Sequence, residues 1–306
     1  LENAWWAAIS AWMIMNVPEP HAVLVKGFLR IAGTIVGAVV GCFITAQVEG
    51  YASLQMIVLG TAVALGCYQR HHAEYAYAWF IGFLMIAMLI AEALQEPTEV
   101  VSFAYWRVYE IITGVSVATA VIFCMRRVDP AAAATPAPAA KVDERQLAIA
   151  CVFAGVVVVL IVAIWQFYDI PSIFQVIVTI TAVQFPDLAD TRRMALNRLA
   201  GCIMGGTAGL LMVGLANQAL MLWALTFFFG MFVFSLIHHG GSRRIHPYIG
   251  TQAGMAFIIA MITADGPSST ILPVLDRLTG IFLAFMIVGA LAYAVEPWTR
   301  RRPASG

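Results

Sequence analysis

The 306-residue sequence has little charge. Charged residues make up 11% of the chain, whereas soluble domains carry roughly 25%. The 17 basic and 17 acidic residues balance to zero net charge and form no basic block interleaved with aromatic residues. Nucleic acid is therefore not an expected partner. The shortage of charge argues against an ordinary soluble domain.

Cysteine and histidine are also scarce, with five and six residues respectively. No CxxC pair occurs, and each cysteine lies in or beside an apolar run, so we interpret all five as packing residues. The paired histidines His71-His72 and His238-His239 fall short of the histidine boxes of membrane di-iron enzymes. No nucleophile lies in a pattern with a base. We expect no metal, no cofactor and no enzyme activity.

Apolar residues are abundant instead, at 61% of the chain with a mean hydropathy of +0.86. Apolar runs near the length of about 20 residues that a membrane-spanning helix needs recur along the sequence. We predict an all-α polytopic membrane protein. The expected spans are Ala4–Asn16, Phe28–Ala46, Leu54–Cys67, Tyr75–Ala93, Tyr105–Met125, Leu147–Phe167, Ile173–Phe185, Ala195–Leu215, Ala219–Ile237, Thr251–Ala264 and Leu275–Val295.

The chain repeats itself at an offset of 168 residues. Arg30, Gly33, Gly37 and Gly41 recur as Arg198, Gly201, Gly205 and Gly209. Pro18 and Pro186 share this offset, and the histidine pairs recur at 167. An internal duplication in a very hydrophobic chain is typical of transporters built from two related halves.

The repeat predicts two parallel halves of about six helices each. Residues 1–128 form the first transmembrane repeat, 129–144 a Pro/Ala-rich linker, 145–299 the second repeat and 300–306 a basic tail. The second repeat opens with Leu147–Phe167, which has no counterpart in the first. We therefore expect a first helix to be absent from this chain, and an even number of helices per half makes the repeats parallel.

Lysines and arginines predict the orientation, because they collect on the cytoplasmic side of membrane proteins. Fifteen of the seventeen fall on one side of the predicted topology, together with the linker and the C-terminus. The opposite loops carry acidic residues such as Glu49 and Glu96. We expect a multi-pass inner-membrane protein whose linker and C-terminus are cytoplasmic.

The repeated glycines lie on one helix face in each half. Residues spaced by three or four positions lie on the same face of a helix. Arg30 therefore shares a face with Gly33, Gly37 and Gly41. Arg198 likewise shares a face with Gly201, Gly205 and Gly209. Such stripes favour close helix packing, or alternatively a groove that admits a substrate. The two arginines are expected at the cytoplasmic end of each stripe, where an arginine side chain can reach the interface.

Short apolar segments precede Pro18 and Pro186, and neither is long enough to cross the hydrocarbon as a straight helix. Matching short segments in two halves indicate a binding site, with tilted or interfacial helices as the alternative. Their candidate substrate-binding residues are Trp12, Asn16, Gln175, Thr179 and Gln184. Trp5 and Trp6 are predicted either to belong to this site or to form an aromatic belt at the membrane interface.

Two arginines depart from the charge pattern, Arg107 and Arg277. Glu110 lies three residues after Arg107, and Asp276 is adjacent to Arg277. An arginine fork suits a carboxylate, so we predict substrate binding by the arginines and proton coupling by the acids. The alternative is a structural salt bridge near the periplasmic surface.

Three motifs follow one another in the first half: the Trp-Trp-Ala-Ala segment at residues 5–8, the Val-Pro-Glu-Pro turn at 17–20 and the Arg-x-x-Gly-x-x-x-Gly helix at 30–37. The second half has a segment at each matching place, in which Pro186 and the Arg-x-x-Gly-x-x-x-Gly pattern at 198–205 recur. Together they resemble the fusaric acid resistance and aromatic acid exporter family. The resemblance implies a Gram-negative inner-membrane exporter of aromatic carboxylates such as p-hydroxybenzoate or fusaric acid, driven by protons and assisted by a periplasmic adaptor. Relatives often carry a sizeable cytoplasmic domain between the halves, where this chain has only a short linker.

Two other functions stay open at this point. Plant malate-activated channels resemble distant relatives, so a passive organic-anion channel is one alternative. A membrane scaffold without transport is the other, with the glycine stripes as contact surfaces. These stripes also make a homo-oligomer plausible.

Overall fold

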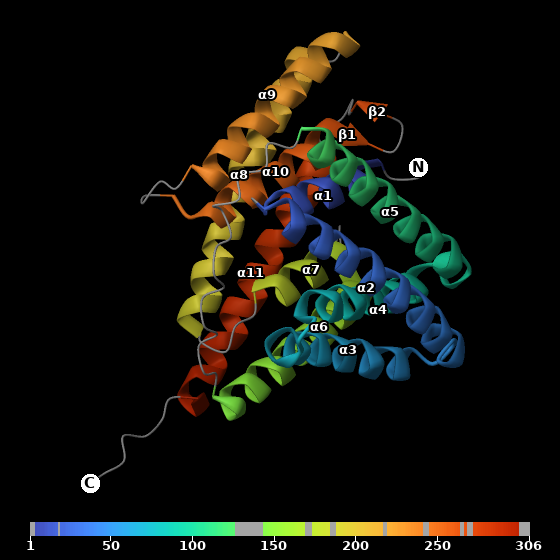
Figure 1. The fold of residues 1–306 in the computed structure, drawn as a ribbon. Helices are drawn as coiled ribbons and strands as arrows, with labels where there is room; N and C mark the ends of the chain where they lie inside the picture. Colours follow the sequence, from blue (N-terminus) through green and yellow to red (C-terminus); the bar gives the residue numbers. More distant parts are fainter. Residues whose placement is uncertain are drawn as a thin grey trace.

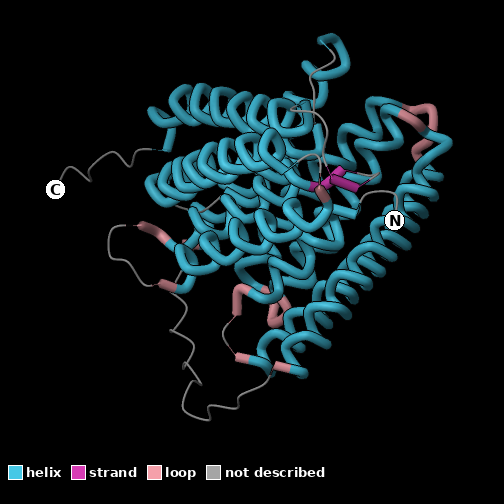
Figure 2. Tube along the Cα trace, turned by 90° about the horizontal axis from the view of Figure 1, so that it is seen from above, coloured by secondary structure: helices cyan, strands magenta, loops and turns pink. Residues whose placement is uncertain are grey.

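The computed structural model describes residues 4–17, 19–125, 143–168, 173–183, 188–216, 219–240, 245–263, 266–267 and 272–299. Helices dominate this part of the chain (Figure 2). They are α1 (Ala4–Met15), α2 (Pro20–Gln47), α3 (Ala52–His72), α4 (Ala76–Gln95), α5 (Val100–Cys124), α6 (Glu144–Tyr168), α7 (Ile173–Val183), α8 (Leu188–Ala216), α9 (Leu220–His239), α10 (Pro247–Met261) and α11 (Leu272–Thr299). A 3₁₀ turn, η1 (Pro97–Glu99), precedes α5, and β1 (Ile262–Thr263) pairs antiparallel with β2 (Gly266–Pro267).

Within the described residues, seven helical segments are long and apolar enough to cross a membrane. They are Pro20–Gln47, Ala52–His72, Ala76–Gln95, Pro97–Cys124, Glu144–Tyr168, Asp190–Val213 and Leu220–His239. Many large apolar side chains on them face outward, including Phe28 on α2 and Phe228 on α9, each 70% exposed. The prediction of an all-α polytopic membrane protein is therefore confirmed.

Each glycine stripe lies at a contact between two helices. A Cβ added at Gly33 on α2 would lie 2.5 Å from the carbonyl oxygen of Ala78 on α4. The counterpart on α8, Gly201, would place a Cβ 2.6 Å from the carbonyl oxygen of Ile249 on α10. Only glycine permits such close backbone approach. The stripe therefore brings α2 against α4 in one half and α8 against α10 in the other.

The two short helices occupy the centre of the molecule. Figure 1 shows α1 and α7 between the group from α2 to α5 and the group from α8 to α11. Gly114 of α5 packs against the backbone of Ala7, while the Trp12 ring lies 2.5 Å from the position of a Cβ at Gly254 on α10. Helix α1 therefore touches both halves of the chain.

Helix α6, the first of the second half, packs on α3 of the first half. Gly60 and Gly155 meet backbone to backbone at this contact. Around them lies the largest of the apolar core clusters, with Leu59, Val158 and Ile161 fully buried. Helix α7 extends this cluster through Ile177 and Ile180. The halves are thus joined by a continuous apolar core that holds α7 in place.

Candidate functional site

A cavity of about 460 Å³ lies between α1 and α7. Helices α2, α3, α4, α8 and α10 supply the rest of its lining. Its polar and aromatic lining residues are Trp5, Trp6, Arg30, Arg70, Tyr77, Phe80, Gln175, Arg198, Tyr248 and Gln252. We call it the arginine cavity. The two short apolar segments that precede Pro18 and Pro186, now α1 and α7, therefore border a cavity.

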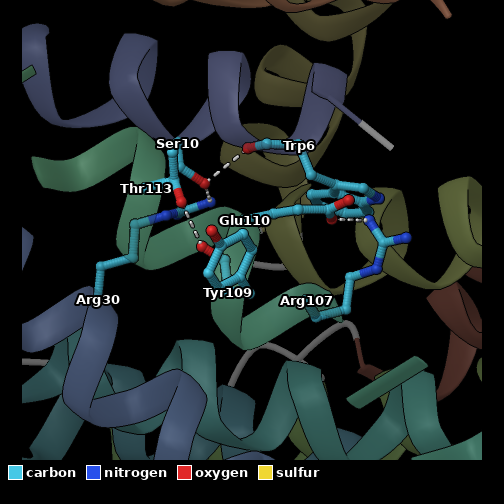
Figure 3. Close-up of polar contacts among 7 residues, drawn as sticks. All are labelled: Trp6, Ser10, Arg30, Arg107, Tyr109, Glu110 and Thr113. Carbon is cyan, nitrogen blue, oxygen red and sulfur yellow. Dashed lines mark hydrogen bonds and ion pairs between the residues drawn. The ribbon is translucent and has the colours of Figure 1, made fainter. Parts of the chain in front are cut away.

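Arg30 enters this cavity from α2 and is only 5% exposed. Its Nη1 donates a hydrogen bond to the Tyr77 hydroxyl at 2.9 Å, and its Nη2 donates to Ser10 Oγ at 3.2 Å. Figure 3 shows the Ser10 contact, which ties Arg30 to α1. Within the described part of the chain, Nε of Arg30 has no hydrogen-bond partner. The Nε–H group of Arg30 is therefore available to donate a hydrogen bond to a ligand.

Arg198, the repeat counterpart of Arg30, enters the same cavity from α8 and is 2% exposed. Its Nε donates to Thr179 Oγ1 at 3.1 Å and its Nη1 donates to Gln252 Oε1 at 2.9 Å. The partners come from α7 and α10, as Ser10 and Tyr77 come from α1 and α4. The two repeated arginines thus reach one cavity from the two halves.

Two further cations lie at the carboxyl ends of the short helices. Arg70 Nη1 donates to the carbonyls of Thr181 and Ala182 near the end of α7, at 3.3 and 3.1 Å. Lys26 Nζ donates to the carbonyl of Met13 near the end of α1, at 2.6 Å. Cations are favourable at this end of a helix because its last carbonyls lack partners.

The arginine cavity is strongly cationic. No aspartate or glutamate is among its described lining residues, and the described hydrogen-bond partners of Arg30 and Arg198 are all neutral. A buried charge in a low-dielectric site is costly without a counterion. The Arg70 guanidinium also stacks 5.2 Å from the Phe80 ring centroid. An aromatic anion fits this combination of charge and ring surface.

A second cavity of about 470 Å³ adjoins the first. Its lining includes Glu92, Glu99, Ser102, Phe103 and Arg107, and we call it the glutamate cavity. Arg107 Nη1 forms an ion pair with Glu110 Oε2 at 3.0 Å. Both side chains are buried, at 4% and 0% exposure. The pair thus lies inside the protein, as either a structural salt bridge or a substrate-binding pair would.

The Arg107 guanidinium also lies on aromatic rings. Its Cζ is 4.8 Å from the Phe103 ring centroid and 4.9 Å from that of Trp6. Figure 3 shows Arg107, Glu110 and Trp6 together beside the first turn of α1, with Ser10 and Arg30 further along the helix. The Trp5 and Trp6 rings therefore contact the buried Arg107 guanidinium and line both cavities.

The other sequence-predicted site residues divide into three groups. Gln175 lines both cavities and Thr179 holds Arg198. Trp12 and Asn16 bind Thr251 instead, through Nε1 to the carbonyl at 3.0 Å and through Nδ2 to the hydroxyl at 3.5 Å, which fastens α1 to α10. Gln184, the side chain of Arg277, most of the linker and the tail at 300–306 lie outside the described residues. Asp276 is half-buried near the start of α11.

The sequence predicted that Arg30 and Arg198 reach the interface from the cytoplasmic end of each glycine stripe, and the structure places both side chains in the buried arginine cavity. Each lies ten residues inside its helix, after Pro20 and Leu188, or about 15 Å from the helix start at 1.5 Å per residue. The available signal was the glycine stripe, because it puts Arg30 on the packed face of its helix and not on the lipid face. The sequence did not predict Arg70 as a site residue, because basic residues in the last turn of a helix are common and Arg70 lies in the last turn of α3.

The fold and the cavities define a polytopic membrane protein with charged, aromatic cavities between its halves. The model of the fusaric acid resistance protein family matches residues 1–156, a little over half of the chain. The chain belongs to this family, which is a family of membrane transporters. The predicted resemblance is thereby confirmed. No curated protein and no solved structure matches the chain.

Proposed function

We propose that the protein exports aromatic carboxylic acids, of the p-hydroxybenzoate and fusaric acid type, across the bacterial inner membrane. The observation that carries the proposal is the arginine cavity, in which Arg30, Arg70 and Arg198 meet aromatic side chains without a lining acid. Arginine binds carboxylates by paired, charge-assisted hydrogen bonds. The aromatic walls suit the flat ring of the substrate.

The size and position of the cavity also support this substrate class. At about 460 Å³ it lies within the range of small-molecule sites. Its lining includes Ala76, Tyr77 and Arg70, which are at the helix ends that the arginine distribution assigns to the cytoplasm. An anion from the cytoplasm would therefore meet this cavity first. Alternate exposure of the site by movement of the two halves would complete transport.

Proton coupling is part of the proposal, and the glutamate cavity supports it. Arg107 offers a second binding charge for the carboxylate, while Glu110 competes for the same guanidinium at 3.0 Å. Protonation of Glu110 would release Arg107 to bind the substrate. Asp276 and Arg277 are proposed to act in the same way in the second half, and the family suggests a periplasmic adaptor as partner.

The test is uptake of labelled p-hydroxybenzoate into everted membrane vesicles under an imposed pH gradient. We expect accumulation that a protonophore abolishes. Flux that only equilibrates, with or without the protonophore, is the result for a passive anion channel. The absence of any protein-dependent flux, with the adaptor present or absent, contradicts transport and favours the scaffold.

A further inference from the structure

We infer that Trp5, Trp6 and Gln175 form a gate between the arginine cavity and the glutamate cavity, and that α1 couples the gate to both charge sites. The inference rests on the proposed function, because a gate requires a solute that passes through. It adds a second compartment, with Ser102, Glu92, Glu99 and Arg107, through which the anion leaves.

The first observation is that the two cavities share a wall. Trp5, Trp6 and Gln175 line both of them. The Trp5 and Trp6 rings are stacked with their centroids 4.6 Å apart and their planes at 27°. These rings extend from α1 of the first half, and Gln175 extends from α7 of the second. Movement between α1 and α7 would therefore open the wall.

The second observation is the difference in charge across the wall. The arginine cavity carries three arginines and the glutamate cavity carries two glutamates beside Arg107. An anion is held strongly on the first side and weakly on the second, because like charges repel at short range. The wall separates a binding compartment from a release compartment. Arg107, under the Trp6 ring, is the positively charged residue among the described lining residues on the exit side.

The third observation is a chain of contacts along α1. Ser10 Oγ donates to the carbonyl of Trp6 at 2.8 Å and accepts from Arg30 at 3.2 Å. The Trp6 ring covers Arg107, and Figure 3 shows this path from Arg30 through Ser10 and Trp6 to Arg107. A carboxylate bound to Arg30 would compete with Ser10 for the guanidinium. Substrate binding would thereby release α1 from α2 at Ser10, beside the turn that carries the Trp6 ring.

The other end of α1 is fixed, which makes it the pivot. Trp12 donates to the carbonyl of Thr251, and the Nε2 of His238 lies 3.1 Å from the carbonyl of Asn16. Both contacts attach the carboxyl end of α1 to the second half. The first turn, with Trp5 and Trp6, packs instead on α5 of the first half, where the backbone of Ala7 meets Gly114. Movement of the first half relative to the second would therefore move the gate.

The experiment measures access to each cavity from each side of the membrane and uses no substrate. Single cysteines are placed by Val178→Cys in the arginine cavity and Ser102→Cys in the glutamate cavity, after replacement of the five native cysteines. An impermeant maleimide is added to everted and to right-side-out vesicles. We expect the two cysteines to react from opposite faces. Adding Trp6→Ala should make the cysteine at 178 reactive from both.

Two controls separate the gate from general damage. Trp6→Phe retains a ring and should keep the wall closed, and Trp79→Ala removes a 46% exposed ring on α4 and should change nothing. A chain that keeps only Cys151, buried in the α3–α6 contact, should stay unlabelled with Trp6→Ala. If Cys151 reacts in this chain, the Trp6→Ala variant has unfolded. The labelling is then measured with Trp5→Ala instead.

The inference is overturned if the cysteines at 102 and 178 react from the same side of the membrane in the chain with Trp6 unaltered. It is also overturned if the cysteine at 178 reacts from one side only in the folded Trp6→Ala variant. Neither result depends on transport. Failure of the gate is therefore distinguishable from failure of the proposed function, which the vesicle uptake of the unaltered chain decides.

Discussion

At the scale of single residues, Arg30 and Arg198 are the buried charges on which the proposed function depends most. Both are at least 95% buried with neutral hydrogen-bond partners in the described chain. Buried ionisable groups in membrane proteins are expensive and usually functional. A carboxylate that binds between them would offset the cost by supplying the missing negative charge.

Replacement of Arg198 by Gln should weaken the binding of an aromatic carboxylate while leaving the protein folded. A hydrogen bond to a charged group contributes about 1.5–3 kcal/mol, so KM for uptake should rise roughly 10- to 150-fold. Arg192→Gln is the matched control, because Arg192 is an exposed arginine on the same helix. An unchanged KM in the Arg198 variant removes it from the site.

Replacement of Glu110 by Gln should destabilise the protein, since Arg107 then stays buried without its ion-pair partner. Breaking a buried pair costs about 3–5 kcal/mol. Thermal unfolding in detergent should show a lower midpoint for Glu110→Gln and a recovery when Arg107→Met is added. Glu49→Gln, at an exposed loop position, should have no effect. A normal midpoint for Glu110→Gln refutes the ion pair as a stabilising contact.

At the scale of helices, the glycine stripes set the distance between neighbours. A side chain at Gly37 would enter the backbone of Gly82 on α4, and one at Gly205 would enter the backbone of Ala253 on α10. These contacts cannot yield through a side-chain rotation, because the obstacle is backbone. The stripes therefore fix how closely α2 approaches α4 and α8 approaches α10, and these four helices also line the arginine cavity.

Substitution of Gly205 by Leu should separate α8 from α10 and reduce the amount of folded protein. The measurement is the monodisperse fraction on size-exclusion chromatography after extraction. Gly289→Ala is the control, because a Cβ at Gly289 has nothing within 4 Å. Equal yields for the two variants would show that close contact along this stripe is dispensable.

The sequence predicted the helices well because their signals are local. Apolar length and flanking polar residues placed the described part of each expected span mostly on a helix, including the short α1 and α7, although Thr251–Ala264 runs past the end of α10 into β1. The partners of these helices were not predictable, because they depend on side chains far apart in the sequence. The Trp12 contact with Thr251 joins residues 239 positions apart. The sequence proposed Trp12 for substrate binding but could not predict that its ring fastens α1 to α10.

At the scale of the whole molecule, the predicted class came from composition and the repeat. The cavities did not, since they exist only where α1 and α7 meet helices from both halves. Their charge could be predicted only in part. Arg107 and Glu110 were recognisable as a pair from their spacing, but convergence of Arg30 with Arg198 requires the two halves to face each other.

Orientation is a prediction at this same scale. The basic residues place the linker and the C-terminus in the cytoplasm. Fusion of a fluorescent protein to the C-terminus should give a fluorescent cell, and fusion of a periplasmic phosphatase should give an inactive enzyme. The opposite pair of results would invert the topology and place the arginine cavity at the periplasmic side.

The most direct measurement is an experimental structure of the protein with p-iodobenzoate bound, in which the iodine marks the position of the ring. We predict density in the arginine cavity, with the carboxylate within hydrogen-bonding distance of Arg30 or Arg198 and the ring against Phe80 or the tryptophans. Ligand density only outside this cavity, or a carboxylate pointing away from all three arginines, would contradict the account.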